Sequence, residues 1–305
     1  MASDKKFFNL YKLFSLISVI RGYNILVLVI AQYLASIYIF SSEKSFVNVA
    51  LDLHLFFVIF SNVCVIAGGY IINNFYDVKA DKINRPFKAG LDNFVRQETR
   101  LKIYFALNLI AVLFGLLVSW RAALFFSINI FAIWLYSHKL KRYPLAGLIS
   151  VTTLTILPFF IIFVYFKNFS KIIFVHAVFL YLVIMVRELV KDLENMKGAV
   201  VNNYKTFPVV YGERNTKLTC LALLCCTLIP IFFLLSNPAI SYMRYYFYFT
   251  LFSLVIIGGI LLKSTKKQHF TIIHLALKIL LLVGVLSIVL IDTSLLVDKV
   301  MKSFY

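Results

Sequence analysis

Charged residues are scarce in this chain: they make up 14% of its 305 residues, whereas hydrophobic residues make up 62%. That balance excludes a water-soluble α/β or all-α enzyme. Cysteine is also rare, and the four cysteines fall in apolar runs without a C-x-x-C pair, so we interpret them as packing residues. The alternating ten-residue pattern of an outer-membrane barrel is absent. The first residues lack the apolar core and cleavage site of a signal peptide, so we expect no removed leader.

Apolar runs recur along the chain at the length that a helix needs to cross a ~30 Å hydrocarbon core, roughly 20 residues. In lipid each backbone amide must be satisfied within its own segment, which favours helices. We therefore predict an all-α integral membrane protein, a single domain over residues 1–305. Residues 1–21 are predicted to lie along the membrane interface. The nine predicted transmembrane helices are 22–40, 53–72, 101–118, 122–136, 145–165, 171–187, 217–235, 242–262 and 272–292.

The net charge of +18 would suggest nucleic acid in a soluble protein, but its distribution here indicates topology, and we expect no nucleic acid partner. Lysine and arginine gather in the connections after the second, fourth, sixth and eighth helices, while the other connections hold few. Because basic loops stay on the cytoplasmic side, we predict a multi-pass protein of the cell (inner or cytoplasmic) membrane. Its amino terminus is then cytoplasmic and its carboxyl terminus outside, as an odd number of spans requires.

The few acidic residues are concentrated in two segments, 73–100 and 187–216, which we expect to be cytoplasmic and to continue the second and sixth helices. If each stays helical, steps of three and four place its acidic and amide side chains on one face. Such faces are also expected of ordinary solvated helix ends. Carboxylates at a step of four repel one another, however, which favours a cation or basic partners nearby. The two stripes are Asn73, Asn74, Asp77 and Asp81 in the first segment and Glu188, Asp192 and Asn195 in the second.

Carboxylate and amide oxygens are ligands for Mg²⁺, which takes one or two protein carboxylates together with substrate phosphates. Nearby lysine and arginine residues complement the phosphate oxygens that a metal leaves free. The two stripes therefore predict a diphosphate site with Mg²⁺ as cofactor. No Walker A loop, G-x-S-x-G elbow or H-E-x-x-H pair occurs, so nucleotide hydrolysis, serine hydrolysis and zincin chemistry have no support.

Five segments, in order along most of the chain, resemble signatures of the UbiA superfamily of intramembrane prenyltransferases. They are Arg21–Asn24, similar to R-P-x-N; Asn73–Asp81 with Asn84-Arg85-Pro86, similar to N-D-x-x-D-x-x-x-D; Tyr136–Arg142 with Gly147, similar to Y-S-x-x-L-K-R; Arg187–Gly198, similar to R-E-x-x-K-D-x-x-D-x-x-G-D; and Lys205–Gly212, similar to K-T-L-P-x-x-x-G. The resemblance implies nine helices around a cytoplasm-facing polar cavity. It also implies Mg²⁺-assisted loss of diphosphate from an allylic prenyl diphosphate and capture of the cation by a lipid or aromatic acceptor.

Under this resemblance the catalytic residues are Asp77, Asp81 and Asp192, and Asn73 joins them as a metal ligand. The predicted substrate-binding residues are Arg21, Asn24, Asn73, Asn74, Tyr136, Lys141, Arg142, Glu188, Lys191 and Asn195. The sequence departs from the signatures at three positions, where Asn74, Asn195 and Ala199 replace aspartates. These departures leave open a family member that binds prenyl lipids without turnover.

The form R-E-x-x-K-D followed by K-T-x-P resembles most the branch that contains geranylgeranylglyceryl-phosphate geranylgeranyltransferases. We therefore expect a glycerol-phosphate ether lipid as acceptor. An aromatic acceptor of a quinone, chlorophyll or haem pathway is the alternative.

Overall fold

The computed structural model describes residues 14–41, 46–92 and 94–291. These residues contain nine helices long and apolar enough to cross a membrane, as predicted. The helices are α2 (Gly22–Ala35, continued by η1, Ser36–Phe40), α4 (Leu53–Asn84), α6 (Gln97–Val118), α7 (Trp120–His138), α8 (Pro144–Phe166), α9 (Lys171–Glu194), α11 (Phe207–Leu235), α12 (Arg244–Lys263) and α13 (Lys267–Ser287). Residues 1–13 of the predicted interfacial segment lie outside the described residues.

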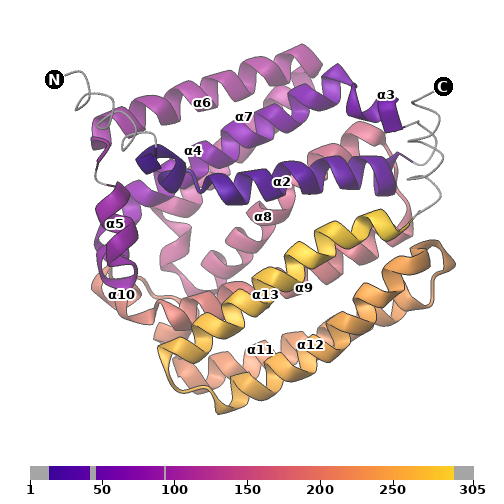
Figure 1. The fold of residues 1–305 in the computed structure, drawn as a ribbon. Coiled ribbons are helices and arrows are strands. Elements are labelled where there is room, and N and C mark those ends of the chain that lie inside the picture. The colour runs from indigo at the N-terminus through magenta and orange to yellow at the C-terminus, as the bar shows by residue number, and fades with distance from the viewer. Residues whose placement is uncertain (1–13, 42–45, 93, 292–305) are drawn as a thin grey trace, which may run out of the picture.

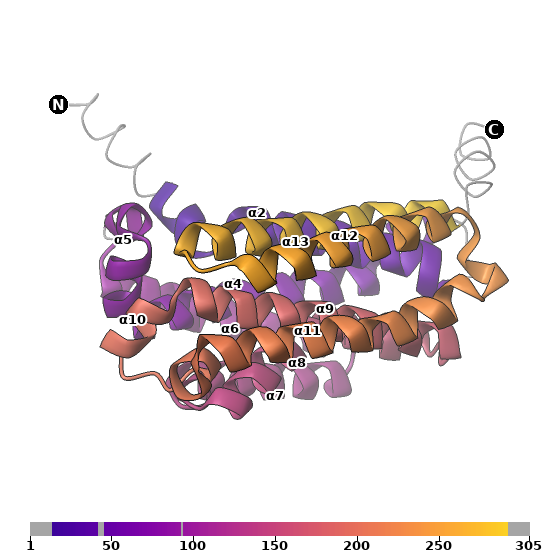
Figure 2. The same cartoon turned by 90° about the horizontal axis from the view of Figure 1, so that it is seen from below.

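The long helices run side by side between two ends of one bundle (Figures 1 and 2). Helix α4 packs against α6 and α7, and α9 packs against α8, α11 and α13. Two short helices, α5 (Pro86–Asp92) and α10 (Met196–Val201), lie together at one end, which we call the polar end. The segments 73–100 and 187–216, predicted as cytoplasmic motif-bearing loops, are largely helical: they comprise the ends of α4 and α9, these two short helices and the starts of α6 and α11.

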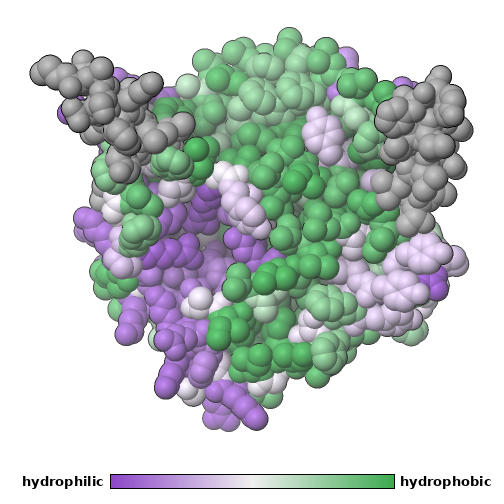
Figure 3. All heavy atoms as spheres, in the orientation of Figure 1, coloured by the Kyte–Doolittle hydropathy of each residue, from purple (hydrophilic) through white to green (hydrophobic). Residues whose placement is uncertain are grey.

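The surface separates into an apolar part and the polar end. Figure 3 shows hydrophobic residues over most of the visible face, and hydrophilic residues gathered around α5 and α10 and in a hollow between α2 and α13. Large apolar side chains such as Phe105, Phe232 and Val255 are exposed along the spans. This pattern is that of a helix bundle whose flanks face lipid, because lipid tails solvate such side chains.

Local sequence explains where the chain turns at the polar end. In the segment Lys205–Gly212, Pro208 lies in the first turn of α11, where a missing N–H costs nothing. Gly212 then takes a φ of 79°, a conformation that favours glycine, and the helix axis changes direction there. The motif K-T-x-P-x-x-x-G therefore marks the start of α11 at the polar end and the kink at Gly212 within this helix.

Candidate active site

One cavity of about 730 Å³ opens at the polar end. Most residues predicted from the two stripes and the other motifs line it. They are Arg21, Asn24, Asn73, Asp77, Asp81, Tyr136, Lys141, Glu188, Lys191, Asp192 and Asn195. Ala199 lines it as well. Helical spacing places each stripe on one face of its helix, and the packing of the bundle brings the two stripes, more than 100 residues apart in sequence, to a single cavity.

On the α4 side, Asp77 is held by two partners from other elements. The Lys141 ammonium lies 2.5 Å from Asp77 Oδ1 and 2.9 Å from Asn73 Oδ1. The Tyr204 hydroxyl donates to Asp77 Oδ1 at 3.0 Å. Burial, with the charge of Asp77, raises the pKa of the Tyr204 hydroxyl above its usual range, so that it stays a hydrogen-bond donor.

Lys141 reaches Asp77 because of a glycine. Lys141 lies in η2 (Leu140–Arg142), the turn between α7 and α8, and its side chain is almost fully buried. A Cβ at Gly147 would come within 3.1 Å of the Lys141 Cα, so the missing side chain lets η2 fold back against the start of α8. This explains the glycine that follows the Tyr136–Arg142 motif.

On the α9 side, Glu188 is buried and paired with its sequence neighbours. Its carboxylate lies 2.6 Å from Arg187 Nη2 and also accepts a hydrogen bond from Lys191. Asn195 donates from Nδ2 to the Lys191 carbonyl at 2.7 Å. Glu188 therefore orients Arg187 and Lys191 at the cavity wall, and its own charge is already compensated.

Two cavity carboxylates, Asp81 on α4 and Asp192 on α9, have no hydrogen bond or ion pair to any of the described residues. Carboxylates that face a cavity without such partners can bind a hard cation. Within the described ranges, no three histidine, cysteine, aspartate or glutamate side chains are grouped closely enough to hold a metal by themselves. The donor set therefore fits Mg²⁺ shared with a diphosphate, and does not fit a closed protein cage.

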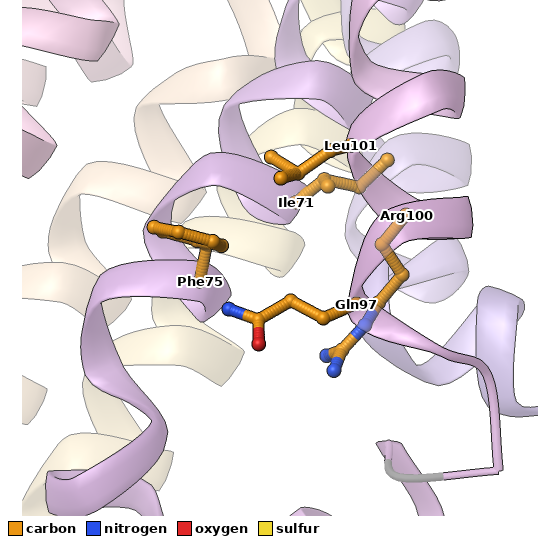
Figure 4. A pocket seen from close by; sticks show the side chains of 5 residues that line it. All are labelled: Ile71, Phe75, Gln97, Arg100 and Leu101. Atoms are coloured by element: carbon orange, nitrogen blue, oxygen red, sulfur yellow. The ribbon is translucent and has the colours of Figure 1, made fainter.

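Two predicted site residues do not line the cavity. Asn74 is buried and points to the other side of α4, where Nδ2 donates to Asp92 Oδ2 at 2.9 Å and Oδ1 accepts from Arg100. Figure 4 shows Arg100 beside Gln97 at the edge of a shallow pocket between α4 and α6, which has no room for a ligand. The side chain of Arg142 is exposed, while its backbone amide donates to the Lys139 carbonyl at 3.1 Å and its carbonyl accepts from the Lys205 amide at 3.0 Å. Adjacent residues on a helix point about 100° apart, which is why Asn73 and Asn74 separate.

Asn84 joins the two motif-bearing segments. Its side chain donates to the Asn195 carbonyl and accepts from the Gly198 amide, both at 3.2 Å. A Cβ at Gly198 would lie 2.2 Å from Asn84 Nδ2, so only glycine leaves room for this bridge. The Asn84-Arg85-Pro86 motif and Gly198 thus form one structural unit that sets the distance between the ends of α4 and α9.

Several polar residues that line the cavity were not among the predicted site residues, among them Asn84, Tyr204, His274 and Lys278. Asn84 stands in the Asn84-Arg85-Pro86 motif, but its partners Asn195 and Gly198 lie more than 100 residues away and no spacing rule indicates them. Tyr204 likewise acts through a distant partner, Asp77. Lys278 did carry a signal, because it interrupts the apolar run of the last span, and a charged residue inside a span is a candidate for a functional site.

A model of the UbiA prenyltransferase family matches residues 29–282. The chain belongs to this family. The prenyltransferase is 28% identical over 237 residues to a digeranylgeranylglyceryl phosphate synthase of Methanobrevibacter smithii, covering 74% of this chain and 80% of that protein. It is 33% identical over 207 residues to the synthase of Methanospirillum hungatei, covering 66% and 69%.

The fold of the prenyltransferase is also that of solved structures. It superposes with a TM-score of 0.68 on a structure described as a digeranylgeranylglyceryl phosphate synthase in membranes, at 24% identity over 92% of this chain and 98% of that chain. With a UbiA homolog from Archaeoglobus fulgidus bound to GPP and Mg²⁺ the TM-score is 0.67, at 11% identity over 90% and 99%. The protein is thus a multi-pass membrane prenyltransferase with a nine-helix fold.

Proposed function

We propose that this protein transfers a polyprenyl group from an allylic prenyl diphosphate to a glycerol-phosphate ether lipid, with Mg²⁺ as cofactor. The observation that carries the proposal is a pair of carboxylates, Asp81 and Asp192, which line one cavity from different helices. We call them the open carboxylates, because neither has a hydrogen bond or ion pair to a described residue. Cationic side chains surround them. The relatives named digeranylgeranylglyceryl phosphate synthase support the acceptor class.

Asp81 and Asp192 would hold the metal. Asn73 and Asp77, which the sequence also predicted as ligands, would act beside it by holding Lys141 at the diphosphate. Bound Mg²⁺ would neutralise the negative charge that develops on the departing diphosphate. Lys141 lies beside Asp77 and can donate to a diphosphate oxygen, because its ammonium has three protons and uses two for Asn73 and Asp77. Arg85 and Lys88 line the same side of the cavity and add two further donors.

Away from the charged groups the cavity is apolar. Leu148, Val151, Leu154 and Phe159 from α8 form one wall. Such a wall can receive an isoprenoid chain and exclude water from the reacting carbon, which keeps water from capturing the cation before the acceptor does.

We propose further that the polar end faces the cytoplasm, because the basic connections all meet there. A single cysteine at the exposed position Lys266, in a background without Cys225 and Cys226, tests this. We expect an impermeant thiol reagent to label it only after sealed, right-side-out cells are opened. Labelling in sealed cells would reverse the orientation.

The acceptor is tested with purified protein, labelled geranylgeranyl diphosphate and a panel of acceptors at equal concentration. The panel holds geranylgeranylglyceryl phosphate, its dephosphorylated alcohol and an aromatic quinone precursor. We expect an ether product, identified by its mass, from the glycerol phosphate, and its loss when EDTA is added. Prenylation of the aromatic compound alone would replace the proposed acceptor, and prenyl diphosphate binding without any product would show a binding protein.

A further inference from the structure

Lys278 is a charged residue in the middle of a membrane span. It is the twelfth residue of α13, about 16 Å from the start of the helix at a rise of about 1.5 Å per residue. A lysine at that depth of a ~30 Å core is costly unless it faces a polar cavity or pairs with an anion. It lines the cavity described above, with its ammonium 4.9 Å from the centre of the Tyr23 ring.

The charged groups that face Lys278 are themselves cations. Arg21, Arg85 and Arg187 are its electrostatic neighbours. In the part of the chain that the structure describes, no carboxylate lies within ion-pair distance of Lys278. Arg187 is occupied by Glu188 at 2.6 Å, whereas Arg21 stacks on the Tyr70 ring at 4.9 Å and has no carboxylate within ion-pair distance among the described residues. Asp81 is an electrostatic neighbour of Arg21. Lys278 and Arg21 thus lie at the boundary of α13 and α2 as two cations without an ion pair to any described residue, and only Arg21 has a carboxylate, Asp81, among its electrostatic neighbours.

The backbone of Arg21 supports a binding role for this pair. Arg21 has a φ of 52° and a ψ of 56°, a left-handed conformation that costs a non-glycine residue about 1 kcal/mol or more. Strain of this kind persists where surrounding structure fixes it, and it is frequent at ligand sites. Here it directs the guanidinium into the cavity at the entry of α2.

The charges of the side chains that line the cavity favour the binding of a second anion. Among the described lining residues there are seven lysine and arginine side chains and four aspartate and glutamate side chains. A diphosphate that is bound with Mg²⁺ carries little net charge, because the metal offsets it. Its binding would therefore leave most of the positive excess uncompensated. Lys278 lies on α13, which contributes none of the four carboxylates.

The wall of α13 becomes apolar immediately after Lys278. Leu281, Leu282 and Val285 line the cavity from the following turns, and Val27 and Leu28 line it from α2. The two helices pack against each other, and Figure 3 shows the hollow between them reaching the apolar surface. A ligand with one anionic head and an apolar tail matches this sequence of polar and apolar groups.

From these observations we propose that Lys278, together with Arg21, binds the phosphate of the acceptor lipid, and that Lys278 is the residue that selects a phosphate-bearing acceptor. This inference rests on the proposed function for its reaction, but the site itself is a property of the cavity. The diphosphate of the donor binds at the carboxylates of α4 and α9, and the acceptor phosphate binds at α13 and α2.

The kinetic test compares the parent with Lys278→Gln, Lys278→Arg and a control, Lys263→Gln, whose side chain is exposed at the end of α12 and does not line the cavity. We expect Lys278→Gln to raise KM for geranylgeranylglyceryl phosphate about 10- to 100-fold, the range for a lost charged hydrogen bond. KM for geranylgeranyl diphosphate should stay at the parent value. With the dephosphorylated acceptor, parent and Lys278→Gln should react alike. Lys278→Arg should restore most of the affinity, and the control should not differ from the parent.

A binding measurement separates this inference from the proposed function. The probe is an alkyl-glycerol phosphate, titrated against the protein in nanodiscs by calorimetry without any prenyl donor. If the probe binds Lys278→Gln more weakly than the parent, but the parent shows no prenyl transfer, the phosphate site is supported and the proposed reaction is wrong. If the parent transfers the prenyl group, but Lys278→Gln has the same acceptor KM and the same affinity for the probe as the parent, the proposed reaction is supported and the phosphate site is wrong. A rise in KM for the prenyl diphosphate alone would assign Lys278 to the donor and likewise overturn the inference.

Discussion

The acidic stripes of α4 and α9 reach the same cavity but use their charges differently. On α4, Asp77 is paired with Lys141 from η2 and with Tyr204 from the connection before α11. On α9, Glu188 is paired with Arg187 and Lys191 of its own helix. Each stripe then contributes one carboxylate, Asp81 or Asp192, that lines the cavity without a hydrogen bond or ion pair to any described residue. In each of the two similar motifs, therefore, one carboxylate is paired and positions cationic side chains, and another has no such partner and can bind a metal.

The largest expected effect comes from removing either open carboxylate. Asp81→Asn and Asp192→Asn preserve the size of the side chain but remove its negative charge. Because a charged metal ligand is lost, we expect each variant to lower kcat/KM about 100-fold or more. Glu188→Gln should act through the placement of Arg187 and Lys191 and cost less. The measurement is prenyl transfer at limiting Mg²⁺, with Glu98→Gln, an exposed carboxylate on α6, as control. Parent-like rates in both asparagine variants would place the metal elsewhere.

A smaller effect is expected from changing the distance between the two stripes. Gly198→Ala puts a Cβ against Asn84, which must move and release the Asn195 carbonyl and the residue 198 amide. We expect kcat/KM to fall about 10-fold, because catalysis is sensitive to shifts on the order of 1 Å. Gly259→Ala on α12 is the matched control, since its Cβ would have no neighbour within 4 Å. Equal activity of the two alanine variants would show that the Asn84 bridge does not set the geometry.

The arrangement of the fold was open to prediction from sequence, while the pairing of individual charges was not. Apolar runs and basic connections predicted the nine spans, steps of three and four predicted that each stripe lies on one helix face, and the family resemblance implied the polar cavity. The same spacing suggested Asn74 as a site residue, but Asn74 does not line the cavity, because Asp92 and Arg100 hold it on the far side of α4. Those partners lie 18 and 26 residues away, so no helical periodicity indicates them. The partners of Asp77 come from elements still further along the chain, for the same reason.

The smallest expected effect concerns the two positions of the α9 stripe where aspartate is replaced. Asn195 and Ala199 both line the cavity, so Asn195→Asp/Ala199→Asp adds two negative charges near Asp192. We expect the Mg²⁺ concentration for half-maximal rate to fall several-fold, since the affinity of a hard cation follows ligand charge. A Mg²⁺ titration of diphosphate release in parent and double variant measures the shift. An unchanged midpoint in an active protein would remove both positions from the metal environment.

The central claim is that one carboxylate from each stripe holds a metal together with the diphosphate. Mn²⁺ titrations followed by electron paramagnetic resonance test it directly, with the protein in nanodiscs and a non-hydrolysable prenyl thiodiphosphate. We predict tight Mn²⁺ binding to the parent only when the diphosphate analogue is present, and binding at least about 10-fold weaker in Asp81→Asn and in Asp192→Asn alike. Equal Mn²⁺ affinity in the parent and in both variants would contradict the account.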